Sequence, residues 1–323
     1  MTIINANNMT LSVVLCTYNG ERFLREQLDS VLSQTLMPDE IVVSDDCSYD
    51  NTWSILLNYK QKHPSLFKLY RNEKNCGVLE NFRKAFHYAS SELVAICDQD
   101  DIWMPSKLEL SVELMEKTGA GVVCCCEQVL KQDGRVEVYN IPQVTTKNVV
   151  FNAGFRGHLM VCRKEMLDAC YVSQYICYDG AISLYAIASN KLSIVNMVGC
   201  IWRRHDKTVT TDEVLPYENL GKWSKWTRAM KMIMMGKRSD SIARLMNATA
   251  LILDRTIGMS KENQLFAKMA RMMERQSFIS MLVADWLYMR ATMLSDDFND
   301  LRTREKLGRV AYAFRFPTVW WYD

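Results

Sequence analysis

The stretch Ala95-Ile96-Cys97-Asp98-Gln99-Asp100-Asp101-Ile102-Trp103 begins as an apolar run and ends in three carboxylates within four residues. Like charges this close repel and raise one another's pKa, so the cluster opposes stability when it is left alone. A divalent cation would remove the conflict, because hard cations take oxygen ligands and reach phosphates as well. The alternative is a solvated acidic turn that caps the following helix, since acidic residues are common in turns.

Two earlier apolar runs, residues 11–16 and 41–43, also predict strands that end in polar residues. Segments with helical periodicity separate the runs, and this alternation predicts an α/β fold with a mostly parallel sheet and helices on both faces. In such sheets ligands bind beyond the carboxyl ends of the strands, so the polar residues are expected at one edge. They are Thr17, Tyr18, Asn19, Asp45, Asp46, Asp98, Gln99, Asp100 and Asp101.

The charge of the chain is divided unevenly along its length. Residues 221–323 hold 18 Lys and Arg against 10 Asp and Glu, although the whole chain of 323 residues has a net charge of only +2. A chain of this length builds one large core, or one domain with a smaller one. We therefore expect a first domain at 1–215 and a basic helical region at 216–323, whose charge suits an anionic partner surface.

The eleven cysteines show no paired metal-binding spacing, and several lie inside apolar runs, where free cysteine behaves as a small buried hydrophobe. Residues 1–10 lack the charged and apolar regions of a signal peptide. No run of about 18 apolar residues is present that would span a membrane as a helix. These features predict a protein of the reducing cytoplasm.

The basic region also contains aromatic residues. Residues 221–238 combine Lys and Arg with Trp and Met, and residues 315–322 hold a second aromatic group. Such composition is typical of segments that lie on anionic lipid, so we expect a peripheral location on the inner face of the cell membrane. The alternative is that these residues pack on the first domain. Nucleic acid is not expected as a partner, because no recognition motif accompanies the charge.

Three blocks of the sequence, taken in order, resemble family 2 glycosyltransferases with the GT-A fold. Residues 11–19 match a strand followed by Thr-Tyr-Asn, and residues 45–52 resemble Asp-Asp-Gly-Ser-x-Asp-x-Thr with Cys47 at the usual glycine. Residues 98–101 resemble the Asp-x-Asp-Asp metal motif, in a form closest to bacterial rhamnosyltransferase-like members. The resemblance covers roughly residues 10–210 and does not extend to the last hundred.

This resemblance implies a nucleoside-diphosphate sugar donor of UDP or dTDP type and a glycan or lipid-linked acceptor. It implies Asp179 as the catalytic base, Asp101 as a brace for the turn, and His158 near the acceptor side. Mn²⁺ or Mg²⁺ would be held by Asp100, Asp98 and His205. The residues implied in binding the nucleotide sugar are Thr17, Tyr18, Asn19, Asp45, Asp46, Asn81, Asp98 and Gln99.

The implied roles form a sufficient set for an inverting transfer. The reaction needs a base on the acceptor hydroxyl and a cation on the departing diphosphate. Simpler interpretations also exist, since Asp179 suits a helix cap and His205 a surface histidine. Two rival functions are a nucleotidyltransferase, which normally has a Gly-rich basic loop where residues 18–21 stand, and a binding protein with an inactive sugar-nucleotide site.

Overall fold

The computed structural model of the chain describes residues 9–139, 155–171, 176–205, 240–256 and 260–294. Its strands are β1 (Leu11–Thr17), β2 (Glu40–Asp45), β3 (Phe67–Arg71), β4 (Leu93–Cys97), β5 (Ile102–Trp103), β6 (Val122–Leu130), β7 (Val136–Tyr139), β8 (Met160–Arg163) and β9 (Leu192–Arg203). Its helices are α1 (Leu24–Leu32), α2 (Thr52–Lys62), α3 (Val78–Tyr88), α4 (Lys107–Thr118), α6 (Tyr178–Ala188), α8 (Asp240–Asp254), α9 (Lys261–Arg275) and α10 (Phe278–Met293), with 3₁₀ segments η1 (Gly157–Leu159) and η2 (Lys164–Tyr171).

The described strands form one sheet in the order β3-β2-β1-β4-β8-β6-β9-β5, with β7 paired to β6. Strands β3, β2, β1 and β4 run parallel, and β6 and β9 form another parallel pair. Strand β8 runs antiparallel between β4 and β6, so it returns the chain through the middle of the sheet. The predicted α/β fold is confirmed, and β8 is an insertion that the helix–strand alternation did not predict.

Helices cover both faces of the sheet, as predicted. Alternate residues of β1 point to opposite sides: Val13 and Leu15 join an apolar cluster with α1, α2 and α4, whereas Val14 and Cys16 join a second cluster with α3 and α6. Both clusters are buried, so β1 is covered on both faces and reads as a continuous apolar run. This arrangement leaves the strand ends as the place for polar residues.

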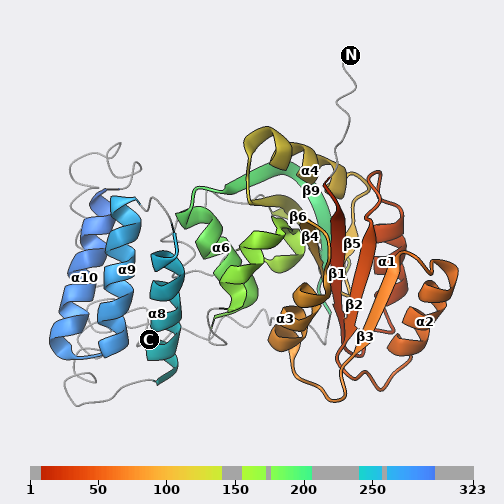
Figure 1. Cartoon of the computed structure of the whole chain (residues 1–323), viewed down its shortest axis with the longest axis horizontal. Helices are drawn as coiled ribbons and strands as arrows, with labels where there is room; N and C mark the ends of the chain where they lie inside the picture. Colours follow the sequence, from red (N-terminus) through yellow and green to blue (C-terminus); the bar gives the residue numbers. More distant parts are fainter. Residues whose placement is uncertain (1–8, 140–154, 172–175, 206–239, 257–259, 295–323) are drawn as a thin grey trace.

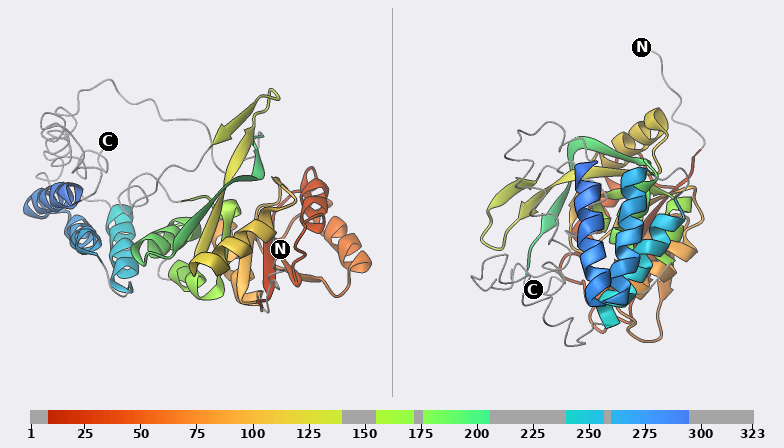
Figure 2. Two further views of the ribbon diagram at one scale, coloured as in Figure 1. Left: turned by 90° about the horizontal axis from the view of Figure 1, so that it is seen from above. Right: turned by 90° about the vertical axis from the view of Figure 1, so that its left-hand side faces the viewer.

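The helices α8, α9 and α10 lie side by side at the end of the molecule opposite α1 and α2 (Figures 1 and 2). Helix α8 packs on α6, and the second apolar cluster continues from the sheet through α6 into all three helices. Among the described helices, none combines the length and the apolar character needed to cross a bilayer. The predicted boundary at residue 215 and the segments 221–238 and 315–322 lie outside the described residues.

Strands β6 and β7 form an antiparallel hairpin that extends beyond the rest of the sheet (Figure 2). The structure describes this hairpin as far as residue 139.

Candidate active site

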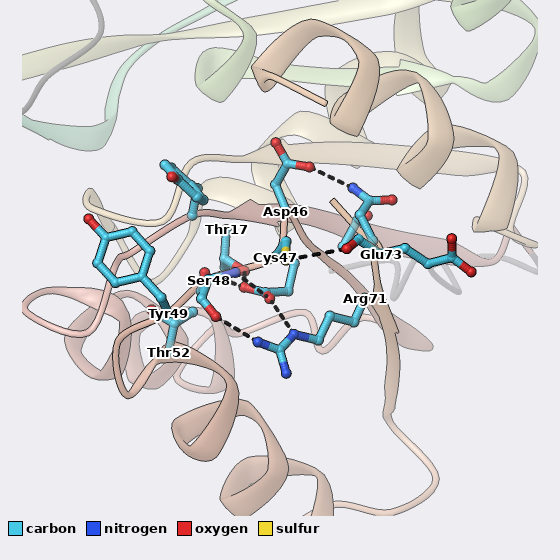
Figure 3. A network of polar contacts seen from close by, with 12 residues as sticks. Thr17, Asp46, Cys47, Ser48, Tyr49, Thr52, Arg71 and Glu73 are labelled. Atoms are coloured by element: carbon cyan, nitrogen blue, oxygen red, sulfur yellow. Dashed lines mark hydrogen bonds and ion pairs between the residues drawn. The ribbon is translucent and has the colours of Figure 1, made fainter. Parts of the chain in front are cut away.

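The residues at the ends of β1 and β2 form a network of polar contacts, in which Thr17, Ser48 and Arg71 lie close together (Figure 3). Asp45 is the central acceptor of this network. Its Oδ1 accepts hydrogen bonds from Thr17 Oγ1 at 3.0 Å and from Ser48 Oγ at 2.5 Å, and its Oδ2 accepts one from the Ser48 amide at 3.0 Å. Arg71 Nε lies 3.3 Å from Oδ2, and Arg71 Nη2 donates to the Ser48 carbonyl. Because Asp45 is fully buried, its carboxylate holds the two loops together from within.

Asp46 organises the neighbouring loop in a similar way. Asn72 Nδ2 donates to Oδ1 at 2.8 Å, and the amides of Cys76 and Gly77 each donate at 2.9 Å. Burial opposes ionisation here, but the hydrogen bonds from Cys76, Asn72 and Gly77 hold the pKa of Asp46 below its usual range. Asp46 therefore stays charged and shapes the loop between β3 and α3.

Three more of the predicted nucleotide-binding side chains also bond to the protein itself. Gln99 pairs with the backbone of Tyr18, accepting from its amide at 2.9 Å and donating to its carbonyl at 3.1 Å. Asn81 Nδ2 donates to the Ser44 carbonyl, and Asn19 Oδ1 accepts from the Tyr49 amide. These bonds place the loops after β1, β2 and β4 next to one another, as the sheet topology predicted.

Tyr18 and Tyr49 are the exposed residues of this region. Tyr18 is 43% exposed and Tyr49 is 83% exposed, and their rings meet edge to face with centroids 6.3 Å apart. Beside them, Cys47 has φ +62°, which is the left-handed conformation that glycine adopts without strain. This backbone angle explains why the family pattern has glycine at the position of Cys47.

The acidic loop after β4 differs in its contacts. Asp101 Oδ1 accepts from the Arg203 amide at 3.2 Å, which agrees with its predicted bracing role, but its buried Oδ2 has no hydrogen-bond partner among the described residues. Asp100 Oδ2 lies 2.8 Å from His205 Nε2. Burial and the charge of Asp98 raise the pKa of Asp100, and burial raises the pKa of Asp101 as well. The loop keeps the conflict between like charges that its sequence implied.

His158 is a second residue that joins this loop to the rest of the sheet. It is only 2% exposed, and its Nδ1 lies 3.3 Å from Asp98 Oδ2 and 3.7 Å from Asp101 Oδ2. Its Nε2 lies 3.0 Å from Glu127 Oε2 on β6, and Lys107 Nζ donates to its carbonyl at 2.6 Å. Burial opposes the charged imidazole, but the carboxylates of Asp101 and Asp98 raise the pKa of His158 above its ordinary value.

Asp179 lies in the first turn of α6 and is half-buried. Its Oδ1 accepts from the Gly180 amide at 2.7 Å, so part of the cap interpretation is present. Burial raises its pKa, and the nearby charge of Asp98 acts in the same direction. Tyr178, the residue before Asp179, lies against Gly157, and a Cβ at position 157 would collide with the ring and hydroxyl of Tyr178. Glycine at position 157 therefore lets α6 approach the segment that carries His158.

A second group of atoms that could hold a metal ion includes Asp101 of this loop. One oxygen of Asp101, one ring nitrogen of His158 and Cys200 Sγ lie within 4.8 Å of one another, and all three residues are buried. Burial raises the pKa of Cys200 well above its ordinary value, whereas metals bind the thiolate. The positive charge of Lys107 acts on the pKa of this thiol in the opposite direction, so the protein itself already supplies a positive charge in this part of its interior.

The structure thus gathers the predicted residues at one sheet edge, in two groups of different character. Asp98, Asp100, His205 and Asp179 belong to the acidic side. The others belong to the bonded loops after β1 and β2, to which Gln99 after β4 and Asn81 of α3 are hydrogen-bonded. His158, which the resemblance implies near the acceptor side, lies against Asp98. The sequence did not predict Glu127 or Arg71; the signal for Glu127 was a single acidic residue within the apolar run of β6.

An α/β sheet with acidic loops at the carboxyl ends of β2 and β4 defines the class of the protein as a GT-A-type nucleotide-sugar fold. The structure of S. aureus TarS residues 1–349 in complex with UDP shares this fold, with a TM-score of 0.56 and 17% identity, over 94% of this chain and 81% of that chain.

The sequence comparisons identify the family. Residues 12–138 match the model of Glycosyl transferase family 2, so this part of the chain is a family 2 glycosyltransferase domain, as the three sequence blocks predicted. The Escherichia coli UDP-Glc:alpha-D-GlcNAc-diphosphoundecaprenol beta-1,3-glucosyltransferase WfgD is 28% identical over 58% of this chain and 73% of its own length. The Shigella flexneri dTDP-rhamnosyl transferase RfbG is 29% identical over 47% and 55%.

The matches cover only part of the relatives. The chain spans 37% of the length of mycobacterial proteins that are 35% identical to it over 127 residues. Sequence similarity therefore identifies the domain that carries the acidic loops, and the substrates of the whole protein are a matter of proposal.

Proposed function

We propose that the protein is an inverting, metal-dependent glycosyltransferase. It would move a sugar from a nucleoside-diphosphate donor to a hydroxyl of a glycan or lipid-linked oligosaccharide in the synthesis of a cell-surface polysaccharide. The observation that carries the proposal is the acidic loop at the end of β4, in which carboxylates with raised pKa values lie beside the separate carboxylate Asp179. The names of WfgD and RfbG, which specify UDP-Glc and dTDP-rhamnose chemistry, support the donor class.

The residues of the loop fit a hard divalent cation. Asp98 and Asp100 offer carboxylate oxygens that are partly exposed, with side chains 35% and 22% accessible, and His205 adds a ring nitrogen beside Asp100. Mn²⁺ or Mg²⁺ bound there would neutralise the charge that develops on the departing nucleoside diphosphate. Asp101 remains a brace in this proposal, because its only described hydrogen bond is to the backbone of Arg203.

Asp179 is the proposed base. Its carboxylate would accept the proton of the acceptor hydroxyl as the hydroxyl attacks the anomeric carbon opposite the leaving group. A raised pKa suits this role, since a base works best when its pKa approaches the working pH. The rate should rise with pH until Asp179 ionises, above the ordinary range of aspartate.

The experiment is a donor screen with Mn²⁺ and a panel of UDP and dTDP sugars, read by mass spectrometry for nucleoside diphosphate and glycosylated product. Transfer by the wild type and a loss of about 10²- to 10⁴-fold in Asp179→Asn are expected, with donor binding retained. Retained transfer in the variant would remove Asp179 as the base. Release of pyrophosphate would indicate a nucleotidyltransferase, and donor binding without turnover would indicate a binding protein.

A lipid-linked acceptor would require contact with a membrane surface, and we propose a peripheral location on the inner face of the cell membrane. Helix α10 supports this part of the proposal. Its exposed residues include Ile279, Val283 and Trp286, and the Arg290 guanidinium lies 5.1 Å from the centre of the Trp286 ring. Tryptophan with arginine on an apolar helix face is typical of segments at anionic lipid.

Point substitutions test the membrane contact better than deletion, because α8 to α10 share their core with the sheet. The pair Ile279→Ser and Trp286→Ser should reduce sedimentation with anionic vesicles, while Val138→Ser on the β6–β7 hairpin should not. Val138 is a matched control, since it is also apolar and 57% exposed. Equal sedimentation of all variants would contradict the contact.

A further inference from the structure

The Asp98 carboxylate has a specific support inside the molecule. Among the described residues, the side-chain nitrogen within ion-pair distance of this carboxylate is His158 Nδ1, at 3.3 Å. Asp98 is partly exposed, whereas His158 is buried. A partly exposed carboxylate is therefore tied to a nitrogen that solvent does not reach.

His158 is itself fixed from several directions. Its Nε2 lies 3.0 Å from Oε2 of Glu127 on β6, and Nζ of Lys107 on α4 donates a hydrogen bond to the His158 carbonyl at 2.6 Å. The imidazole also lies over Trp202 of β9, with ring centres 6.1 Å apart and planes inclined by 28°. A ring held at both its edge and its face has no alternative rotamer to adopt without breaking buried contacts.

The support continues outward to solvent. Arg156 forms an ion pair with Glu127, and its guanidinium lies 3.9 Å from the centre of the Trp202 ring. The buried Glu127 carboxylate therefore has partners on both sides, which a buried charge requires. A continuous row of charged groups runs from Arg156 through Glu127 and His158 to Asp98.

We propose that His158 is a positioning residue that fixes the Asp98 carboxylate for the divalent cation and the donor diphosphate. This inference rests on the proposed function. It assigns the two histidines at the loop to different tasks: His205 lies beside Asp100 at the partly exposed end, and His158 orients Asp98 from within the sheet. Partners that orient metal ligands typically change metal affinity by about 10- to 100-fold when they are removed.

Two substitutions separate the contacts of the ring. In His158→Asn the amide nitrogen falls near the position of Nδ1, so the donor to Asp98 is kept and the contact with Glu127 is lost. In His158→Gln the amide nitrogen falls near Nε2, so the contact with Glu127 is kept and the donor to Asp98 is lost. Glu127→Gln is the matched control, because it weakens the support on β6 without touching Asp98 directly.

The measurement is the affinity for Mn²⁺ in the presence of UDP, by calorimetry or electron paramagnetic resonance, together with the melting temperature of each metal-free variant. We expect His158→Gln to weaken Mn²⁺ binding by about 10- to 100-fold and His158→Asn to stay within about threefold of the wild type. Turnover at saturating Mn²⁺ should recover more fully in His158→Asn than in His158→Gln.

Two outcomes would overturn the inference alone. Wild-type affinity in His158→Gln would show that Asp98 needs no support from the ring. Equal losses in both variants, in proportion to their melting temperatures, would show a merely structural histidine. If the wild type itself binds no Mn²⁺ with UDP, the proposed function fails and the inference fails with it, so the wild-type titration distinguishes the two.

Discussion

Two acidic clusters stand at the same edge of the sheet, and their surroundings differ. The carboxylates of Asp45 and Asp46, after β2, receive hydrogen bonds from the protein on all of their oxygens. In the loop after β4, one buried oxygen of Asp101 has no hydrogen-bond donor among the described residues, and the pKa of Asp100 is raised by burial and by Asp98. The carboxylates of the first cluster therefore receive more hydrogen bonds from the described part of the chain than those of the second.

This difference shows why acidic residues in similar positions have different tasks. A carboxylate with a full set of donors is stable as an anion and works as a structural element. A group of carboxylates that repel one another costs stability, and such a cost persists where a function requires it. The difference agrees with the proposed function, in which the loops after β1 and β2 shape the site and the loop after β4 holds a cation.

The largest expected effect follows from removing a charge in the second cluster. Asp100→Asn should lower metal-dependent turnover by at least about a hundredfold, because metal stabilisation of the leaving group supplies several kcal/mol. Its thermal stability should be unchanged or higher, since one of the repelling charges is gone. Steady-state release of nucleoside diphosphate and thermal melting measure both effects, and unchanged turnover would place the metal elsewhere.

The same substitution in the first cluster should act on folding. Asp45→Asn removes the negative charge that Thr17, Ser48 and Arg71 contact. Hydrogen bonds to charged groups contribute about 1.5–3 kcal/mol each, so we expect the free energy of unfolding to fall by about 2 kcal/mol. Urea denaturation measures this, with Asp100→Asn as the control that should lose little. A stability loss in Asp100→Asn as large as that in Asp45→Asn would contradict the difference between the two clusters.

The smallest effect concerns the backbone between the clusters. Cys47→Gly should stabilise the fold by up to about 1 kcal/mol. The left-handed conformation costs residues other than glycine about 1–2 kcal/mol, and glycine offsets part of this gain because it loses more backbone entropy on folding. Cys47→Val should destabilise, since a β-branched residue tolerates positive φ poorly. If the melting temperatures of the two variants fall in the opposite order, the backbone explanation for the family's glycine is wrong.

The sequence predicted the parts of this arrangement that follow from local pattern. Apolar runs that stop at polar clusters identified β1, β2 and β4, and parallel topology then required their ends to meet at one edge. It did not predict β8, because the four residues Met160–Arg163 pair antiparallel with strands far away in the sequence. A short apolar run carries no signal of its partners.

The division of labour within the site was also beyond sequence pattern. Asp45 and Asp98 are the same residue type at the ends of β2 and β4, the two strands that flank β1, and their donors distinguish them. Those donors, Arg71 for Asp45 and His158 for Asp98, come from other elements of the fold. Asp101 is the exception, since its role as a brace was implied by the family pattern and agrees with its bond to the Arg203 amide.

The most direct test of the account is the position of Mn²⁺ in crystals grown with UDP, located by its anomalous scattering. We predict one manganese peak bordered by Asp100, Asp98 and His205, and no such peak in crystals of Asp100→Asn. A peak among Asp101, His158 and Cys200, or no ordered manganese in the wild type, would contradict the claim that the acidic loop after β4 is the metal site.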